Sequence, residues 1–218
     1  MKKLLLSLGL FLVLILGGCA TYEEPHKVPS AFGERIKTIL VLPMDDYCLA
    51  ERGLTLYCPV TGVITGEIEP GARDIMDNLL KKELLQLNTK TKFYFLTRQE
   101  FEALLEEALE GKIKSHEGLI RFFTGKTQTE ALLYGKIFRF KERKGSSWSV
   151  VEPASVAFVL TLYDSTTGKI LWQKVFDETQ KPLSENLLNL PLYGKIKWLK
   201  AEELAERGLK NILKTFPF

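Results

Sequence analysis

The sequence predicts an α/β domain in which helices pack on a mixed β-sheet of about five strands. In the first half of the domain, short apolar runs alternate with amphipathic helical patterns, which favours parallel strand neighbours. In the second half, long strand patterns joined by a tight turn favour antiparallel neighbours. The expected order of elements is β-α-β-α-α-β-β-β-α.

The first strand and helix are separated by a long loop. Residues 38–42 form a short apolar run that Pro43 ends, which is typical of a buried strand. Residues 70–87 repeat apolar side chains at three- and four-residue steps, and Pro70 suits the first turn of this helix. Residues 92–96 are the second strand.

Two further helices follow the second strand. Thr97-Arg98-Gln99-Glu100 is a capping box, because the Thr hydroxyl and the Glu carboxylate can each accept from the other residue's amide. It opens a helix that ends at Gly111. A short helix is expected over residues 115–124, so that the next segment, Gly125-Lys126-Thr127, is a loop. That segment lacks the earlier glycine and the strand-to-helix context of a phosphate-binding loop.

The second half of the domain supplies three strands and a final helix. Strands are expected over residues 131–141, 148–163 and 169–178. Asp164-Ser165-Thr166-Thr167-Gly168 joins the last two as a hairpin turn, with Asp164 as the turn residue. A final amphipathic helix is expected over residues 199–215.

The N-terminus indicates export and lipidation. Met1-Lys2-Lys3 is cationic, and residues 4–16 are uncharged but shorter than the roughly 20 residues that a membrane-spanning helix needs. Leu16-Gly17-Gly18-Cys19 resembles the lipobox of bacterial lipoproteins. Compared with a plain signal peptide or an anchor that contains a cysteine by chance, the combined pattern favours a lipoprotein signal peptide over residues 1–18.

The lipobox resemblance implies that Cys19 carries the lipid anchor, with acyl chains such as palmitate. Two or three acyl chains would hold the protein permanently at the membrane. Ala20 follows the cysteine, and in lipoproteins this favours the outer membrane, facing the periplasm, in a host with two membranes.

The overall composition is that of a globular protein, with 45% hydrophobic and 26% charged residues. Removing residues 1–18 also removes Lys2 and Lys3, which lowers the net charge from +3 to +1. This balance predicts no nucleic-acid partner, because phosphate binding needs a concentrated basic surface. Residues 19–35 hold the lipidated cysteine and a flexible tether, and residues 36–218 form a single domain.

Two cysteines remain after lipidation. Because the compartment is oxidising, a disulfide between Cys48 and Cys58 is the leading interpretation, and two free buried thiols are the alternative. The same loop carries apolar side chains that either present a partner surface or pack on the domain, and both interpretations stay open. These residues are Tyr47, Leu49, Leu54, Leu56 and Tyr57.

No catalytic constellation or cofactor motif stands out. Two His and three Cys are too few for a rich metal site, so no metal is expected. Asp45-Asp46, after the first strand, is the most enzyme-like feature, since strand ends host chemistry in α/β folds. Adjacent carboxylates in a polar loop are nevertheless more often solvated or capping groups.

Several single residues have ordinary structural interpretations. His116, at a helix start, is expected to be solvated or capping. Trp148, Trp172 and Trp198 are expected in the core or at its rim. A basic strand end that can meet anionic lipid or glycan, weakened by Glu142, is formed by Lys136, Arg139, Lys141, Arg143 and Lys144.

The pattern of strands and helices resembles a broad superfamily of envelope lipoproteins. Strand Ile39-Leu40-Val41-Leu42-Pro43, strand Ala131-Leu132-Leu133-Tyr134-Gly135 and the hairpin from Tyr163-Asp164 through Thr167-Gly168-Lys169 to Trp172 carry the resemblance, over about residues 36–215. The superfamily includes the curli-secretion lipoprotein and lipoprotein activators of penicillin-binding proteins. The long two-cysteine loop at residues 44–69 departs from it and indicates an uncharacterised branch.

The resemblance implies a non-enzymatic adaptor, or an assembly or regulatory factor, for another envelope protein complex. Two alternatives stay open: a subunit of an outer-membrane secretion assembly, and an envelope enzyme that uses Asp45 or Asp46. The partner is unidentified, and self-association into a homo-oligomer is also open.

The disulfide interpretation predicts a difference in mass and in reactivity. Unreduced, denatured protein should show no alkylation at Cys48 or Cys58, and both should alkylate after reduction, as mass spectrometry can measure. A closed loop of this size stabilises by about 3 kcal/mol in the chain-entropy model. Alkylation of both thiols without reductant would show that the disulfide is absent.

Overall fold

The computed structural model describes residues 36–46, 62–63, 65–181 and 197–218. All elements of the predicted order are present, and a short hairpin is added between the third and fourth predicted strands. In chain order the elements are β1 Thr38–Val41, α3 Ala72–Leu85, β2 Lys92–Phe95, α4 Arg98–Glu110, α5 His116–Thr127, β3 Ala131–Lys141, β4 Lys144–Gly145, β5 Val150–Glu152, β6 Ser155–Asp164, β7 Ile170–Thr179 and α7 Ala201–Leu213.

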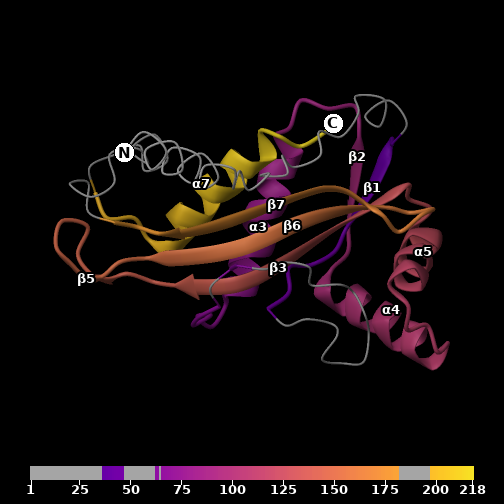
Figure 1. The fold of residues 1–218 in the computed structure, drawn as a ribbon, viewed down its shortest axis with the longest axis horizontal. Coiled ribbons are helices and arrows are strands. Elements are labelled where there is room, and N and C mark those ends of the chain that lie inside the picture. The colour runs from indigo at the N-terminus through magenta and orange to yellow at the C-terminus, as the bar shows by residue number, and fades with distance from the viewer. Residues whose placement is uncertain (1–35, 47–61, 64, 182–196) are drawn as a thin grey trace, which may run out of the picture.

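The main sheet has five strands in the order β2-β1-β3-β6-β7 (Figure 1). Strand β1 pairs in parallel with both β2 and β3, so that Ile39 lies between Phe93 and Ala131. Strands β3, β6 and β7 then pair in antiparallel fashion. The predicted mixed sheet, with parallel neighbours early and antiparallel neighbours late, is confirmed.

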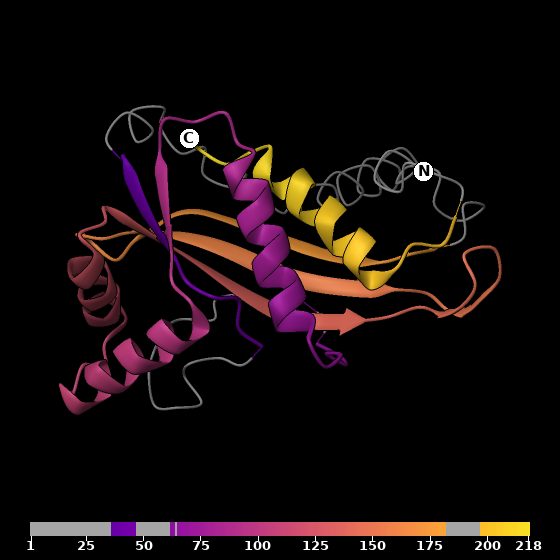
Figure 2. The same ribbon diagram turned by 180° about the vertical axis from the view of Figure 1, so that it is seen from behind.

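Helices cover the sheet from both sides. Helices α3 and α7 lie across one face, where Ile39 and Val41 of β1 join their core (Figure 2). Helices α4 and α5 pack on the opposite face at one end of the sheet, where they contact Leu40 and Leu42. Alternate residues of β1 therefore enter two different cores, as expected for a strand that is buried on both faces.

The predicted local signals at Thr97 and Asp164 are confirmed. The Glu100 amide donates to the Thr97 hydroxyl at 3.2 Å, and the Thr97 amide donates to the Glu100 carboxylate at 2.8 Å. In the β6–β7 turn, Asp164 Oδ1 accepts from the Thr167 amide at 2.7 Å. Gly168 closes the turn with φ 68°, a left-handed conformation that glycine adopts without a steric penalty.

The prediction of one strand over residues 148–163 is wrong, because the segment forms two strands. Residues Val150–Glu152 turn back and pair with Lys144–Gly145, and the long strand begins only at Ser155. Pro153 explains the break, since it has no amide hydrogen for a sheet ladder. The resulting β4–β5 hairpin extends from the end of the sheet opposite α4 and α5 (Figure 1).

Two helix boundaries also differ from the predictions. Pro70 lies in a turn before α3. The Ala72 amide donates to the Glu69 carbonyl at 3.1 Å, and Gly71 has φ 83°. Proline followed by a glycine with positive φ is the preferred composition of a type II turn. Helix α5 extends through Gly125-Lys126-Thr127, so the prediction of a loop over these residues is wrong. The Thr127 hydroxyl donates to the Phe123 carbonyl at 3.0 Å within this last turn.

Close packing at Gly135 leads to a stability prediction. A Cβ at Gly135 in β3 would lie 2.0 Å from Met44 Sδ and 2.9 Å from Leu160 Cδ2, so Gly135→Ala should lower the free energy of unfolding by about 1–3 kcal/mol. Gly125→Ala is the control, because it adds a methyl group to α5 with no atom within 4 Å. That variant should gain about 0.5–1 kcal/mol. Denaturant unfolding checks both, and an unchanged Gly135→Ala protein would contradict the packing argument.

Candidate functional site

The carboxyl ends of β1 and β2 form the best candidate for a binding site. Helix α3, the next described helix after β1, packs on one face of the sheet, and α4, which follows β2, packs on the other face (Figure 2). In open α/β sheets, a crevice opens where neighbouring strands send their connections to opposite faces, and ligands bind there. The topology therefore places a crevice between these two strand ends.

A cavity of about 190 Å³ lies at that position. Its floor is apolar and comes from the strand ends, including Val41 and Leu96, together with Leu80 of α3. Its polar walls come from α3 and from the start of α4. The wall residues are Asp77, Asn78, Lys81, Thr97 and Arg98.

An ion pair joins the two walls of the crevice. Arg98 Nη2 lies 2.8 Å from Asp77 Oδ2 and also donates to the Met44 carbonyl at 3.0 Å. The Met44 amide donates to Asp77 Oδ1 at 2.5 Å. Both polar backbone groups of Met44 are therefore bound by this pair, which fixes the chain just after β1.

Burial raises the pKa of the Asp77 carboxyl above its usual value of 3.8, because partial removal from water disfavours the charged form. The hydrogen bond from the Met44 amide and the charge of Arg98 oppose this effect and lower the pKa in part. Desolvation is the larger cause. The ionised ion pair is therefore held at some cost in folding free energy.

The structure separates the predicted pair Asp45 and Asp46. Asp45 is 1% exposed, and its backbone forms bonds to Gly135 and Ile137 of β3 at 3.0 and 2.6 Å. The prediction of a solvated Asp45 is wrong, because the chain after β1 continues as a neighbour of β3. The Asp45 carboxylate instead accepts from the Asp46 amide at 3.0 Å. Asp46 turns outward, and its carboxylate lies 3.6 Å from Arg73 of α3.

The predictions for His116 and Trp148 are also wrong. His116 is half-buried, with Nε2 at 3.2 Å from the Gly168 carbonyl and its ring edge-on to Tyr163. Ser115 is the residue that caps α5. Trp148 lies in the β4–β5 hairpin with 81% of its surface exposed. Trp172 is buried and Trp198 is half-buried, as predicted.

The charge of the predicted basic strand end is neutralised in part. Arg139 lies 2.5 Å from Asp177, and Lys141 and Lys144 lie 2.5 and 3.0 Å from Glu152. Lys136 is 7% exposed. Acidic residues on neighbouring strands therefore neutralise much of the charge that clusters in the sequence.

Several predictions concern residues outside the part of the chain that the structure describes. They are the signal peptide 1–18, the tether 19–35, the lipidated Cys19, the disulfide Cys48–Cys58 and the apolar loop residues Tyr47, Leu49, Leu54, Leu56 and Tyr57. These remain predictions. Within residues 36–46, 62–63, 65–181 and 197–218, no helix has the length and apolar character that crossing a bilayer requires.

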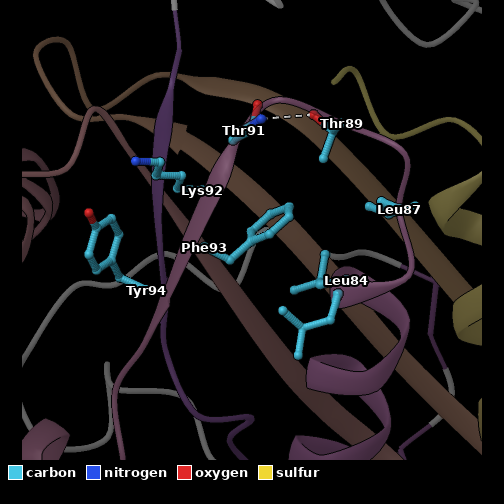
Figure 3. Close-up of a pocket in the computed structure, with 8 residues that line it drawn as sticks. Leu84, Leu87, Thr89, Thr91, Lys92, Phe93 and Tyr94 are labelled. Carbon is cyan, nitrogen blue, oxygen red and sulfur yellow. Dashed lines mark hydrogen bonds between the residues drawn. The ribbon is translucent and has the colours of Figure 1, made fainter.

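A second cavity, of about 420 Å³, lies beside the edge strand β2 (Figure 3). Leu84 of α3 and Leu87, just after this helix, lie on one side, and the Phe93 side chain of β2 points toward them, whereas Tyr94 points to the other side of the strand. The Thr91 amide donates to the Thr89 hydroxyl at 3.1 Å and shapes the connecting loop. Thr89, Thr91 and Lys92 also line this cavity, so its surface is mixed polar and apolar.

Sequence reasoning missed Asp77 and Arg98. Arg98 directly follows the capping Thr97 at the end of the second predicted strand, so the strand-end rule could have indicated it. Asp77 lies on the predicted helix over residues 70–87, but only the tertiary structure brings it to Arg98. Among the described residues, no group of three His, Cys, Asp or Glu side chains could hold a metal ion.

No family model matches the chain, and no curated protein matches it. Similar solved structures include a PelC dodecamer from Paraburkholderia phytofirmans, with 11% identity and a TM-score of 0.48 over 83% of this chain and 87% of that chain. Lipoprotein GNA1162 from Neisseria meningitidis has 15% identity and a TM-score of 0.35, over 72% and 93%. The LpoB C-terminal domain from Salmonella enterica has 13% and 0.37, over 66% and 84%. Similarity at this level assigns no function to the chain.

The raised pKa of Asp77 leads to a prediction about pH dependence. Protonated Asp77 contributes stability below the raised folded pKa, and this contribution is lost as the pH rises from 3.8 through that pKa. Asp77→Asn cannot titrate, so the unmodified protein should lose stability relative to this variant across the same window. Denaturant unfolding over a pH series measures the difference.

Asn78→Ser is the matched control, because it changes the next residue of α3 without altering a titratable group. It should keep the pH dependence of the unmodified protein. Parallel pH profiles of the Asp77→Asn variant and the unmodified protein would contradict the assigned role of Asp77.

Proposed function

We propose that the protein is a lipid-anchored, periplasm-facing envelope protein that acts as a non-enzymatic adaptor or assembly factor for another envelope protein. The observation that carries this proposal is the exposed apolar tip of the β4–β5 hairpin. Trp148 and Val151 are 81% and 85% exposed, and they lie three residues apart in this hairpin. Tryptophan is among the residues that contribute most to protein–protein binding.

Several contacts fix the backbone of the hairpin that carries these side chains. The Ser149 amide donates to the Ser146 hydroxyl at 3.0 Å, which closes the tip. Lys144 pairs with Glu152 across the two strands at 3.0 Å. The Trp198 amide donates to the Ser147 carbonyl at 3.0 Å and joins the hairpin to the segment before α7. A pre-organised apolar surface loses less conformational entropy on binding a partner.

The membrane location in this proposal rests on the sequence. Leu16-Gly17-Gly18-Cys19, after a cationic start and an uncharged run, is the pattern that supports export and lipidation at Cys19. The tether over residues 19–35 can extend at most about 60 Å, since a residue spans up to about 3.5 Å. An anchored domain with this reach can contact partners near the membrane surface.

The hairpin surface can be tested by crosslinking in the native envelope. Full-length protein carrying Trp148→Ala and Val151→Ser should recover its crosslinked partner at least tenfold less than the unmodified chain, because losing a central aromatic residue commonly costs 2 kcal/mol or more. Quantitative mass spectrometry after affinity capture measures the recovery.

Leu85→Ala is the matched control, because Leu85 is an exposed apolar residue (64%) on α3, outside the β4–β5 hairpin. This variant should retain the partner. Thermal unfolding should be the same for all three proteins, since the substituted side chains are exposed. Undiminished capture by the double variant would refute the hairpin as the docking surface.

A further inference from the structure

The crevice at the ends of β1 and β2 carries more positive than negative charge. Its lining includes two cations, Lys81 and Arg98, and one carboxylate, Asp77. Because Asp77 pairs with Arg98, the charge of Lys81 is left in excess at the cavity. The surroundings and the hydrogen bonds of Lys81 and Arg98 indicate which kind of anion fits this crevice.

Lys81 has no carboxylate partner among the described residues. Its ammonium group lies 5.4 Å from the centre of the Phe95 ring, which also lines the crevice. Its neighbour Lys82 points elsewhere and lies 2.7 Å from Glu206 of α7. A cation above an aromatic ring at the crevice wall keeps its ability to bind an anion.

Arg98 is held in a fixed orientation with donors to spare. Both of its hydrogen bonds, to Met44 and to Asp77, use Nη2 alone. Within the described part of the chain, Nε and Nη1 make no hydrogen bond. A guanidinium that is already oriented can offer its remaining N–H groups to an oxyanion, and its planar fork matches a carboxylate.

The floor of the crevice selects for an apolar group beside the anion. Val41 contributes from the end of β1, Leu42 and Pro43 from the residues just after it, and Leu80 and Phe95 from α3 and β2. The cavity of about 190 Å³ equals the share of roughly six water molecules in the liquid. This is below the size of a drug-like ligand site, so it suits a small or terminal group.

We propose that this crevice binds a carboxylate that carries a small apolar group, with Lys81 and Arg98 as the anion-binding residues. Two sources have this chemistry: the C-terminal residue of a peptide chain and a short free carboxylic acid. The site is independent of the hairpin surface, because none of the residues that line it belongs to β4 or β5.

The test is a titration of the full chain in detergent micelles with N-acetyl-L-alanine, followed by amide chemical shifts in NMR. The shifts of Asn78, Thr97 and Arg98 should saturate with a dissociation constant on the order of 1 mM, the range expected for so small a ligand. N-acetyl-L-alaninamide, which lacks the negative charge, should not produce these shifts. Added salt should weaken the binding.

Two variants assign the binding to the named residues. Lys81→Gln should weaken binding about threefold, as expected for the loss of one exposed charge. Lys90→Gln is the control, because Lys90 is an exposed lysine outside the crevice, and it should leave binding unchanged. Arg98→Lys should weaken it about tenfold, because a lysine lacks the planar fork. Lys81→Gln keeps the test valid if the Arg98 variant does not fold.

The remaining outcomes either identify which molecule supplies the carboxylate or overturn the proposal. Tighter binding of a longer acetylated peptide that ends in alanine would identify a peptide C-terminus, and equal or tighter binding of propionate would identify a free acid. Equal binding of the amide, an unaffected Lys81→Gln variant, or binding of inorganic phosphate without any carboxylate would overturn it. Each result is independent of partner capture at the hairpin.

Discussion

Burial of β1 on both faces is the constraint on which the rest of the architecture depends. The strand has only four residues, and Ile39 and Leu40 are fully buried although they point to opposite faces. A parallel strand with neighbours on both edges needs a helical layer on each side. The helix after β1 and the helix after β2 supply these two layers, so they must leave the sheet in opposite directions. The crevice between the strand ends is a direct consequence.

The antiparallel half of the sheet, formed by β3, β6 and β7, differs from β1 because polar side chains occupy part of its outer face. Arg139, Ala157 and Asp177 occupy one row across β3, β6 and β7. Because Ala157 is small, the Arg139 side chain can extend across the middle strand to Asp177, at 2.5 Å. Two rows further along β6, Gln173 donates to the Thr161 hydroxyl at 2.9 Å. These pairs satisfy polar groups on this face of the sheet.

The sequence was sufficient for the element order and the mixed pairing, because periodicity, capping residues and the Asp164–Gly168 turn are local signals. It failed where tertiary contacts override a local pattern. The β4–β5 hairpin depends on a turn at Ser146 and on the missing amide of Pro153, within a run that otherwise reads as one strand. Asp45 looks solvated in the sequence, but pairing with β3 buries it.

The crevice illustrates the same limit at the candidate site. Strand-end reasoning pointed to Asp45 and Asp46 after β1, but neither residue lines the crevice. The charged residues that line it come from α3 and α4, and the paired Asp77 and Arg98 are 21 positions apart. No spacing rule joins Asp77 to Arg98, since the connecting strand β2 and its loops set their separation. To predict such a site, one must know on which face of the sheet each connecting helix packs.

The Asp77–Arg98 pair is better understood as a positioning device than as a source of stability. Half-buried ion pairs gain little, because desolvation offsets the Coulomb attraction, and the raised pKa of Asp77 has the same origin. Replacement of the pair by apolar residues would nevertheless leave the amide and carbonyl of Met44 without their partners. The pair thus holds the end of β1 against both helices. Since this also orients the guanidinium, the crevice is formed before any ligand arrives.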